Sequence, residues 1–228
     1  MKFGVVTFPG SNCDEDMVYV LQDILGQEVE KLWHKDTDLK GVDFIVLPGG
    51  FSYGDYLRSG AIAKLSPIMG EVIKHANNGG YVLGICNGFQ ILTESGLLEG
   101  ALLHNDNQKF ICKNSFIKPG ANSGAITNGL DDRAYKIPIA HGEGRFFASD
   151  EVLKKLQDND QIIFQYCDEE GNLDVASNPN GSLLNIAGIT NENKNVFGMM
   201  PHPERAADHL LANEDGKAIF ESLLKYCK

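Results

Sequence analysis

A cysteine between two glycines is the residue of this chain best suited to nucleophilic chemistry. Gly84-Ile-Cys86-Asn-Gly88 has the spacing of a nucleophile elbow, in which a sharp strand-to-helix turn lifts the central side chain out of the backbone. Glycines are needed at the flanks because side chains there would clash inside so tight a turn. The positive N-terminal end of the following helix would favour a thiolate at Cys86. A free cysteine is most commonly packed in a core, so the motif alone leaves both interpretations open.

A serine lies in a rival motif, Gly50-Phe-Ser52-Tyr-Gly54, which fits the pattern G-x-S-x-G and also follows an apolar run. The residues that come next separate the two candidates. Asp55 and Gly60 make a poor helix opening, so we expect Ser52 to lack the second half of an elbow. The backbone N–H groups of this glycine-rich loop could instead face Cys86, because an oxyanion hole needs donors aimed where negative charge appears on the attacked carbonyl.

A cysteine nucleophile needs a base within hydrogen-bond reach, and the base needs a group that orients it. His202 stands out among six histidines because Pro201 and Pro203 exclude a helix around it. In an extended segment residues two apart point the same way, so His202 and Glu204 would share a face. A carboxylate beside an imidazole holds its tautomer and stabilises the imidazolium. Without Cys86, a rigid surface turn with an incidental ion pair would explain the same residues.

His141-Gly-Glu143-Gly-Arg145 forms the remaining polar group, between two strand-like runs. The glycines around Glu143 leave exposed backbone and a mobile carboxylate, which suit the binding of a small zwitterion. A plain β-turn explains this short pattern equally well. The other histidines are expected at the surface or at the ends of elements: His34, His75, His104 and His209.

Length and composition limit the classes of function. The chain has 228 residues, 43% of them hydrophobic and 22% charged, which fits a single domain over 1–228 with a sizeable core. The net charge of −11 argues against nucleic acid or an anionic membrane as a partner. Five cysteines without C-x-x-C spacing, and no secretory signal peptide, favour reduced thiols in the cytoplasm and no zinc site. There is no G-x-x-x-x-G-K-[ST] loop for ATP and no apolar run of the roughly 18 residues that span a membrane.

The pattern of apolar residues predicts the elements that would position these groups. In the first half of the chain, strands are predicted at 2–8, 29–33, 44–47 and 81–85. Helices are predicted between or after them, at 14–25, 66–77 and 87–95. This alternation is typical of an α/β fold with a doubly wound, mainly parallel sheet, whose active site lies beyond the carboxyl ends of the strands. Both glycine-rich turns, after Leu47 and at Cys86, fall at those ends.

From about residue 97 the character of the sequence changes. Strand-like runs dominate at 109–118, 137–140, 145–148, 161–167, 186–189 and 196–200. Polar turns at 168–172 and 191–195 are typical of hairpins and predict an antiparallel extension of the sheet. A short helix is expected near 150–157 and a last, amphipathic helix over about 215–226.

These motifs resemble those of the class I (triad-type) glutamine amidotransferases, and among them the family of glutaminase subunits of phosphoribosylformylglycinamidine synthase. The matching stretches occur in family order over nearly the whole chain: 9–14, 47–56, 84–90, 141–145 and 201–205. The resemblance implies the flavodoxin-like fold of that class. It assigns no role to Cys13 or to residues 113–136.

The resemblance also implies roles for individual residues. Cys86 would attack the side-chain amide of glutamine, forming a γ-glutamyl thioester and releasing ammonia. His202 would be the general base and acid, and Glu204 would orient it. Backbone N–H groups of Gly50 and Asn87 would form the oxyanion hole. The residues implied in holding the glutamine are Gln90, His141, Gly142 and Glu143.

Partners follow from the resemblance as well. In the family, a larger synthetase subunit (PurL), with a small bridging subunit (PurS), uses the ammonia on formylglycinamide ribonucleotide in an ATP-dependent step of purine synthesis. No cofactor or metal is expected in this chain, and ATP and Mg would bind to the synthetase. The alternatives are a cysteine hydrolase of the same fold acting alone and a non-catalytic binding module. Such hydrolases generally take their histidine from beside the cysteine, where this chain has Asn87.

Overall fold

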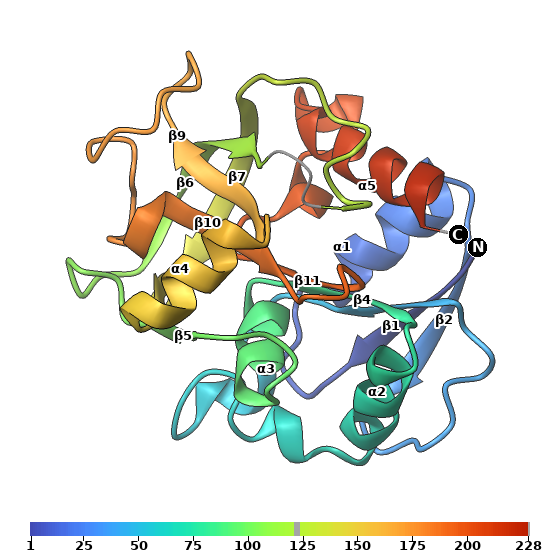
Figure 1. The fold of residues 1–228 in the computed structure, drawn as a ribbon. Coiled ribbons are helices and arrows are strands. Elements are labelled where there is room, and N and C mark those ends of the chain that lie inside the picture. The colour runs from blue at the N-terminus through green and yellow to red at the C-terminus, as the bar shows by residue number, and fades with distance from the viewer. Residues whose placement is uncertain (121–123, 228) are drawn as a thin grey trace.

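The computed structural model describes residues 1–120 and 124–227. Within them, nine strands form one mixed sheet in the order β2-β1-β3-β4-β11-β10-β9-β6-β7 (Figure 1). The strands are β1 (Lys2–Thr7), β2 (Glu28–Trp33), β3 (Phe44–Leu47), β4 (Tyr81–Ile85), β6 (Ile111–Pro119), β7 (Tyr135–His141), β9 (Ile162–Cys167), β10 (Ile186–Thr190) and β11 (Val196–Met199).

The parallel half of the sheet contains β2, β1, β3, β4 and β11. Each of these strands pairs in parallel with its neighbour in that order. This is the flavodoxin-like order of a doubly wound sheet, with β11 in the fifth place. All residues of β3 are buried, as expected for an apolar strand that is covered on both faces. The predicted fold class is therefore confirmed.

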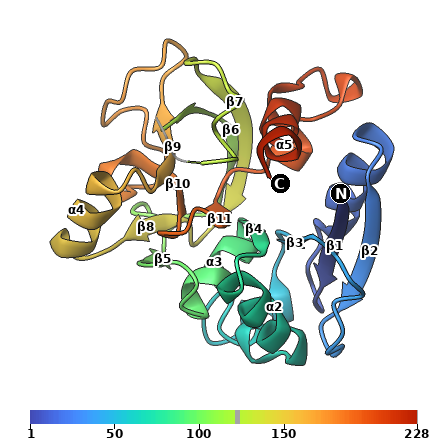
Figure 2. The same cartoon turned by 45° about the vertical axis from the view of Figure 1, so that its right-hand side comes forward.

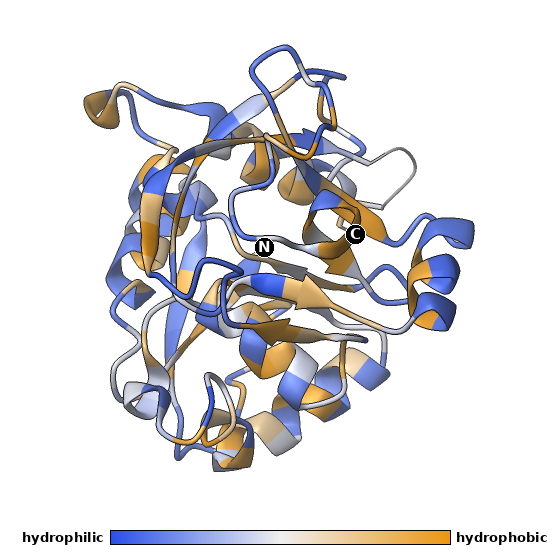
Figure 3. Cartoon of the chain, turned by 90° about the vertical axis from the view of Figure 1, so that its left-hand side faces the viewer, coloured by the Kyte–Doolittle hydropathy of each residue, from blue (hydrophilic) through white to orange (hydrophobic). Residues whose placement is uncertain are grey.

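Helices cover both faces of the parallel half (Figures 1 and 2). α2 (Pro67–Asn77) and α3 (Asn87–Glu94) lie on one face, and α1 (Asp14–Tyr19) and α5 (Asp215–Tyr226) lie on the other. Figure 3 shows that hydrophobic residues are concentrated on the central strands, while the helices carry hydrophilic residues outward. No helix in the described part of the chain is long and apolar enough to cross a membrane.

The antiparallel extension is also confirmed. β10 pairs antiparallel with β11 and β9, and β6 pairs antiparallel with β9 and β7. Two further strands, β5 (Ala101–Leu103) and β8 (Arg145–Phe147), form a separate small sheet, and α4 (Asp150–Asp158) follows them. The strand-like run at 145–148 predicted β8, whereas none of the predicted runs covers β5.

Two local predictions differ from the structure. The turn at 191–195 joins β10 to β11 as expected, but the turn at 168–172 does not join β9 to the next strand. Asp168 and Asn172 close that turn by hydrogen bonds, and the chain then continues irregularly to β10. The helix expected over 14–25 is α-helical only to Tyr19 and continues as a π-helix over Val20–Ile24.

The carboxyl ends of four neighbouring strands bring the candidate residues to one edge of the sheet. Cys13 follows β1, Gly50 follows β3, Cys86 follows β4 and His202 follows β11. Because the four strands are parallel and adjacent, the segments after them lie beside one another. The strand order thus assembles residues that are far apart in the sequence.

Candidate active site

Cys86 lies on the sharp turn between β4 and α3. Its backbone has φ 50° and ψ −105°, a conformation that residues with side chains rarely adopt. A Cβ at Gly84 would come within 2.6 Å of the backbone of Gly88, and one at Gly88 would overlap the carbonyl oxygen of Leu47. The turn therefore requires both glycines. The Cys86 N–H donates to the carbonyl oxygen of Met199 at 2.8 Å, which ties the elbow to the end of β11.

Ser52 does not occupy a second elbow. It begins a short 3₁₀ turn, Ser52–Asp55, with no α-helix directly after it. Its backbone N–H donates instead to the side-chain oxygen of Asn87 at 3.1 Å. The serine loop is thereby attached to the first turn of the cysteine elbow.

His202 and Glu204 form a hydrogen-bonded pair within the protein. His202 Nδ1 donates to Glu204 Oε1 at 2.6 Å, and both side chains are buried. The predicted pairing is present, although its backbone is a 3₁₀ turn over Pro203–Arg205 and not the extended segment that was expected. The N–H of His202 donates to the carbonyl oxygen of Pro138 at 2.8 Å, which holds the turn against β7.

The charges around His202 favour its imidazolium form. Burial acts to lower the pKa of His202, but the charges of Glu204 and Cys86 outweigh burial and raise that pKa well above its usual value. The Cys86 thiol points toward the carbonyl oxygen of Ala140 at 3.7 Å. His202 Nε2 is buried and has no hydrogen-bond partner among the described residues, so it is available for proton transfer.

The two predicted oxyanion donors are backbone N–H groups near Cys86. Asn87 is the first residue of α3, where an N–H has no intrahelical acceptor. Neither that N–H nor the N–H of Gly50 has a partner in the described chain. Gly50 has φ 130°, and a Cβ there would overlap the backbone of Asn12, so this position requires glycine.

A cavity of about 150 Å³ opens in front of Cys86. All the residues predicted to hold the substrate line this cavity: Gln90, His141, Gly142 and Glu143. Gln90 joins the elbow to the glycine-rich loop, because its Nε2 donates to the carbonyl oxygen of Glu143 at 2.6 Å and its Oε1 accepts from Asn87 Nδ2 at 2.9 Å.

Asp55 is a cavity residue that the sequence did not single out. Its Oδ1 accepts a hydrogen bond from Asn87 Nδ2 at 3.1 Å. Burial raises the pKa of Asp55 to about 6, and the charge of Glu143 acts in the same direction. The sequence feature that could have identified Asp55 is the position of a carboxylate at the end of a glycine-rich loop that was expected to face the elbow. The cavity therefore contains two carboxylates, from Asp55 and Glu143.

Asn105 is a second residue that was missed. Its Oδ1 accepts a hydrogen bond from His141 Nδ1 at 3.0 Å, and its Nδ2 donates to the carbonyl oxygen of His141 at 2.9 Å. Burial lowers the pKa of His141 to about 4, and the charge of His202 acts in the same direction. His141 is therefore neutral at pH 7, and its Nε2 is left as an unpaired acceptor among the described residues.

The other four histidines lie at the surface or at the ends of elements, as expected. His104 and His209 have exposed side chains, and His104 also lines the cavity. His75 is in the last turn of α2. His34 directly follows β2, but its side chain is buried and contacts the Tyr53 hydroxyl at 2.6 Å. That contact fastens the serine loop to the end of β2.

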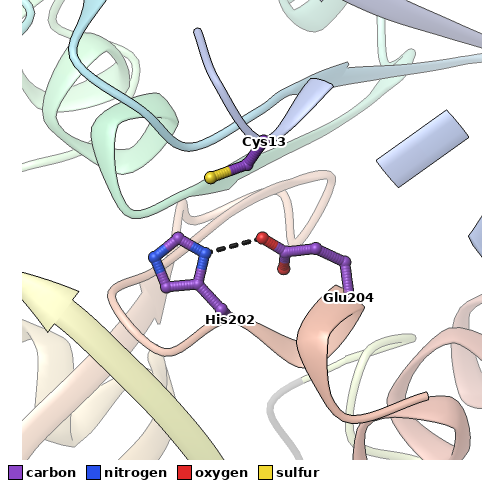
Figure 4. A group of neighbouring side chains, drawn as sticks. All are labelled: Cys13, His202 and Glu204. Atoms are coloured by element: carbon purple, nitrogen blue, oxygen red, sulfur yellow. Dashed lines mark hydrogen bonds and ion pairs between the residues drawn. The ribbon is translucent and has the colours of Figure 1, made fainter. Parts of the chain in front are cut away.

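Cys13 lies beside the histidine–carboxylate pair (Figure 4). One ligand-type atom from each of Cys13, His202 and Glu204 lies within 4.8 Å of the others, although the sequence shows no zinc-ligand spacing. Arg205 Nη2 donates to Cys13 Sγ at 3.1 Å, and this positive charge opposes a cation in the cluster. All five cysteines of the chain are free thiols.

The doubly wound sheet, with a thiol, an imidazole and a carboxylate at its strand ends, has the arrangement expected for a class I glutamine amidotransferase, and the family comparison shows this class. The chain belongs to the family of the CobB/CobQ-like glutamine amidotransferase domain, which matches residues 1–227.

Relatives and solved structures resemble the chain over its whole length. It is 58% identical over 222 residues to phosphoribosylformylglycinamidine synthase subunit PurQ of Synechocystis sp., covering 97% of this chain and 99% of that protein. The subunit of the same name from Moorella thermoacetica is 53% identical over 227 residues, covering 99% and 96%. A chain in the structure of PurLQS from Thermotoga maritima matches with a TM-score of 0.86 and 44% identity, covering 100% and 99%. A glutamine amidotransferase from Thermotoga maritima, 14% identical with a TM-score of 0.61, shares the fold.

Proposed function

We propose that this chain is the glutaminase subunit of phosphoribosylformylglycinamidine synthase. It hydrolyses glutamine to glutamate and ammonia. A synthetase subunit uses this ammonia with ATP to convert formylglycinamide ribonucleotide to formylglycinamidine ribonucleotide. The observation that carries the proposal is the strained elbow of Cys86 beside the buried pair of His202 and Glu204, in a chain similar to PurQ subunits over nearly its full length.

The first half of the reaction is acylation of the thiol. His202 Nε2 takes the proton of Cys86, and Sγ attacks the amide carbon of the glutamine side chain. Glu204, bonded at Nδ1, stabilises the imidazolium. The N–H groups of Gly50 and Asn87 bind the oxyanion of the tetrahedral intermediate. The imidazolium then protonates the leaving nitrogen, the C–N bond breaks and ammonia forms together with the γ-glutamyl thioester.

The second half is hydrolysis of the thioester. His202 Nε2 accepts a proton from water as the water oxygen attacks the thioester carbon. The C–S bond breaks, the proton returns to Cys86 and glutamate leaves. The sum of both halves is glutamine and water giving glutamate and ammonia, with the chain restored.

The carboxylates of the cavity would select the α-ammonium of the substrate. Asp55 and Glu143 lie in the wall of the cavity that Cys86 lines, and charge-assisted hydrogen bonds to an ammonium are stronger than neutral ones. The neutral His141 adds an acceptor at Nε2. Gln90, held between Asn87 and the backbone of Glu143, keeps these groups at a set separation.

The remaining parts of the proposal concern partners and location. The partners are a synthetase subunit (PurL) and a small bridging subunit (PurS), in keeping with the PurLQS structure that the chain matches. No metal or cofactor is assigned to this chain, and ATP and Mg²⁺ are assigned to the synthetase. We place the reaction in the cytoplasm, as the scattered free thiols suggest.

A glutaminase assay with and without the synthetase and bridging subunits tests the proposal. Glutamate release should rise when the subunits are added, and a glutamine-analogue alkylator should label Cys86. The Cys86→Ser chain should neither release glutamate nor react. Labelling of Cys86→Ser as fast as the parent would exclude the thioester mechanism. Release that no partner affects would favour a hydrolase acting alone.

A further inference from the structure

A second cleft, of about 240 Å³, lies beside the glutamine cavity. The two share a wall made by Gly50, Phe51, Phe110 and Ala140. They divide the catalytic groups between them: Cys86 lines the glutamine cavity, and His202 lines the second cleft.

The second cleft differs from the glutamine cavity in charge. Apart from the shared wall and His202, it is lined by Asn12, Cys13, Cys112 and Arg205. These residues include no carboxylate, and their one cation, Arg205, lies against the Cys13 thiol. We call this space the Cys13 cleft.

The reaction requires that ammonia can leave, and that water can enter, beside His202. The leaving nitrogen takes its proton from His202 Nε2, and the hydrolytic water gives its proton to the same atom. While the thioester exists, the glutamyl group occupies the cavity of about 150 Å³ in front of Cys86. Ammonia therefore has to leave, and water has to arrive, by a space that the glutamyl group does not fill.

We propose that the Cys13 cleft is the port through which ammonia leaves the thioester and hydrolytic water reaches it. The inference rests on the proposed function, because it concerns the product of that reaction. Ammonia departs when the amide C–N bond has broken and His202 has supplied the proton. Water enters next, its oxygen binds the thioester carbon, and the C–S bond breaks to restore Cys86.

The charged groups that line the port favour the passage of neutral ammonia over ammonium. A carboxylate on the path would hold ammonium, whereas the guanidinium of Arg205 disfavours a second positive charge nearby. Arg205 is ion-paired with Asp16, whose carboxylate accepts from Arg205 Nε at 3.1 Å, but Asp16 is not part of the cleft lining, so no carboxylate lines the path. The nucleophilic form of ammonia is the neutral one, and this is the form that a synthetase requires.

Two variants of the complex with its synthetase and bridging subunits test the port. Asn12→Trp adds bulk to the cleft, and Arg205→Glu places a carboxylate in it. The first measurement is the amount of formylglycinamidine ribonucleotide formed for each glutamate released. The second is the fraction of the chain that carries a glutamyl adduct after acid quenching, measured by intact mass. Asp16→Ala is the control, because it removes the ion pair of Arg205 without changing the cleft lining.

We expect Arg205→Glu to release glutamate but to lose product per glutamate several-fold, while synthesis driven by added ammonium chloride stays at the parental rate. Asn12→Trp should in addition accumulate the glutamyl adduct, because water arrives more slowly. Parental product ratios and parental adduct levels in both variants would overturn the port. An unmodified complex that releases no glutamate would overturn the proposed function instead.

Discussion

The carboxylate of Glu204 lies 2.6 Å from Nδ1 of His202, in a site where both side chains are shielded from water. This contact sets the tautomer of the ring and leaves Nε2 for the thiol of Cys86. The second oxygen of Glu204 has no partner among the described residues. The carboxylate of Glu204 therefore acts on the imidazole of His202, and we expect catalysis to depend on its negative charge.

Replacing that charge should lower turnover. Glu204→Gln keeps the shape of the side chain but removes the charge that stabilises the imidazolium, and we expect kcat to fall by about 10³–10⁴-fold. KM for glutamine should change little, because Glu204 does not line the glutamine cavity. Steady-state kinetics with the partner subunits measures both constants. Glu214→Gln, at an exposed position near the same turn, is the control and should behave as the parent.

Asp55 should make glutamine binding depend on pH. Because burial raises the pKa of Asp55 to about 6, the carboxylate is partly protonated below that pH and cannot hold an ammonium. KM for glutamine should fall as the pH rises through about 6. Asp55→Asn should remove this dependence and raise KM by about 10–100-fold, as expected from the loss of a hydrogen bond to a charged group. The des-amino substrate glutaramate should be used equally by both chains; a loss for glutaramate as well would argue against ammonium recognition.

His141 should make the protein less stable in acid. Its pKa is about 4 in the folded chain, against an ordinary value near 6.5 when unfolded. Between these values the unfolded chain binds more protons at this residue, so the contribution of His141 to the free energy of unfolding should decrease as the pH falls from 6.5 to 4, by up to about 3 kcal/mol. The raised pKa of Asp55 acts in the opposite direction over part of this range, so the contribution of His141 is measured as the difference between the parent and His141→Gln. Urea denaturation from pH 4 to 6.5 should show that His141→Gln loses less stability in acid than the parent, whereas His209→Gln, at an exposed position, should follow the parent.

The elbow should tolerate no side chain at its second glycine. Gly88→Ala places a Cβ against the carbonyl oxygen of Leu47, so we expect a loss of about 3 kcal/mol or more in the free energy of unfolding. Gly70→Ala is the matched control, because a Cβ there meets nothing within 4 Å and the residue lies inside α2. That substitution should stabilise the chain by up to about 1 kcal/mol. Equal stability of the two variants would contradict the packing of the elbow.

Local sterics and periodicity made much of this protein predictable from its sequence. The spacing of Gly84, Cys86 and Gly88 predicted a strand-to-helix turn, because the clash that requires the glycines acts over a few residues. The apolar run of β3 predicted a strand that is buried on both faces. The prolines around His202 correctly excluded an α-helix, but not the 3₁₀ turn that places Glu204.

Tertiary structure alone decided which residues meet. Whether Cys13, Gly50, Cys86 and His202 lie at one edge depends on strand order, which no local pattern encodes. The same holds for the burial of Asp55, which results from elements distant in the sequence and which shifts its pKa. Sequence periodicity thus determined the elements and the candidate nucleophile. The packing of strands that are far apart along the chain determined the environment that turns a free cysteine into the centre of a proposed active site.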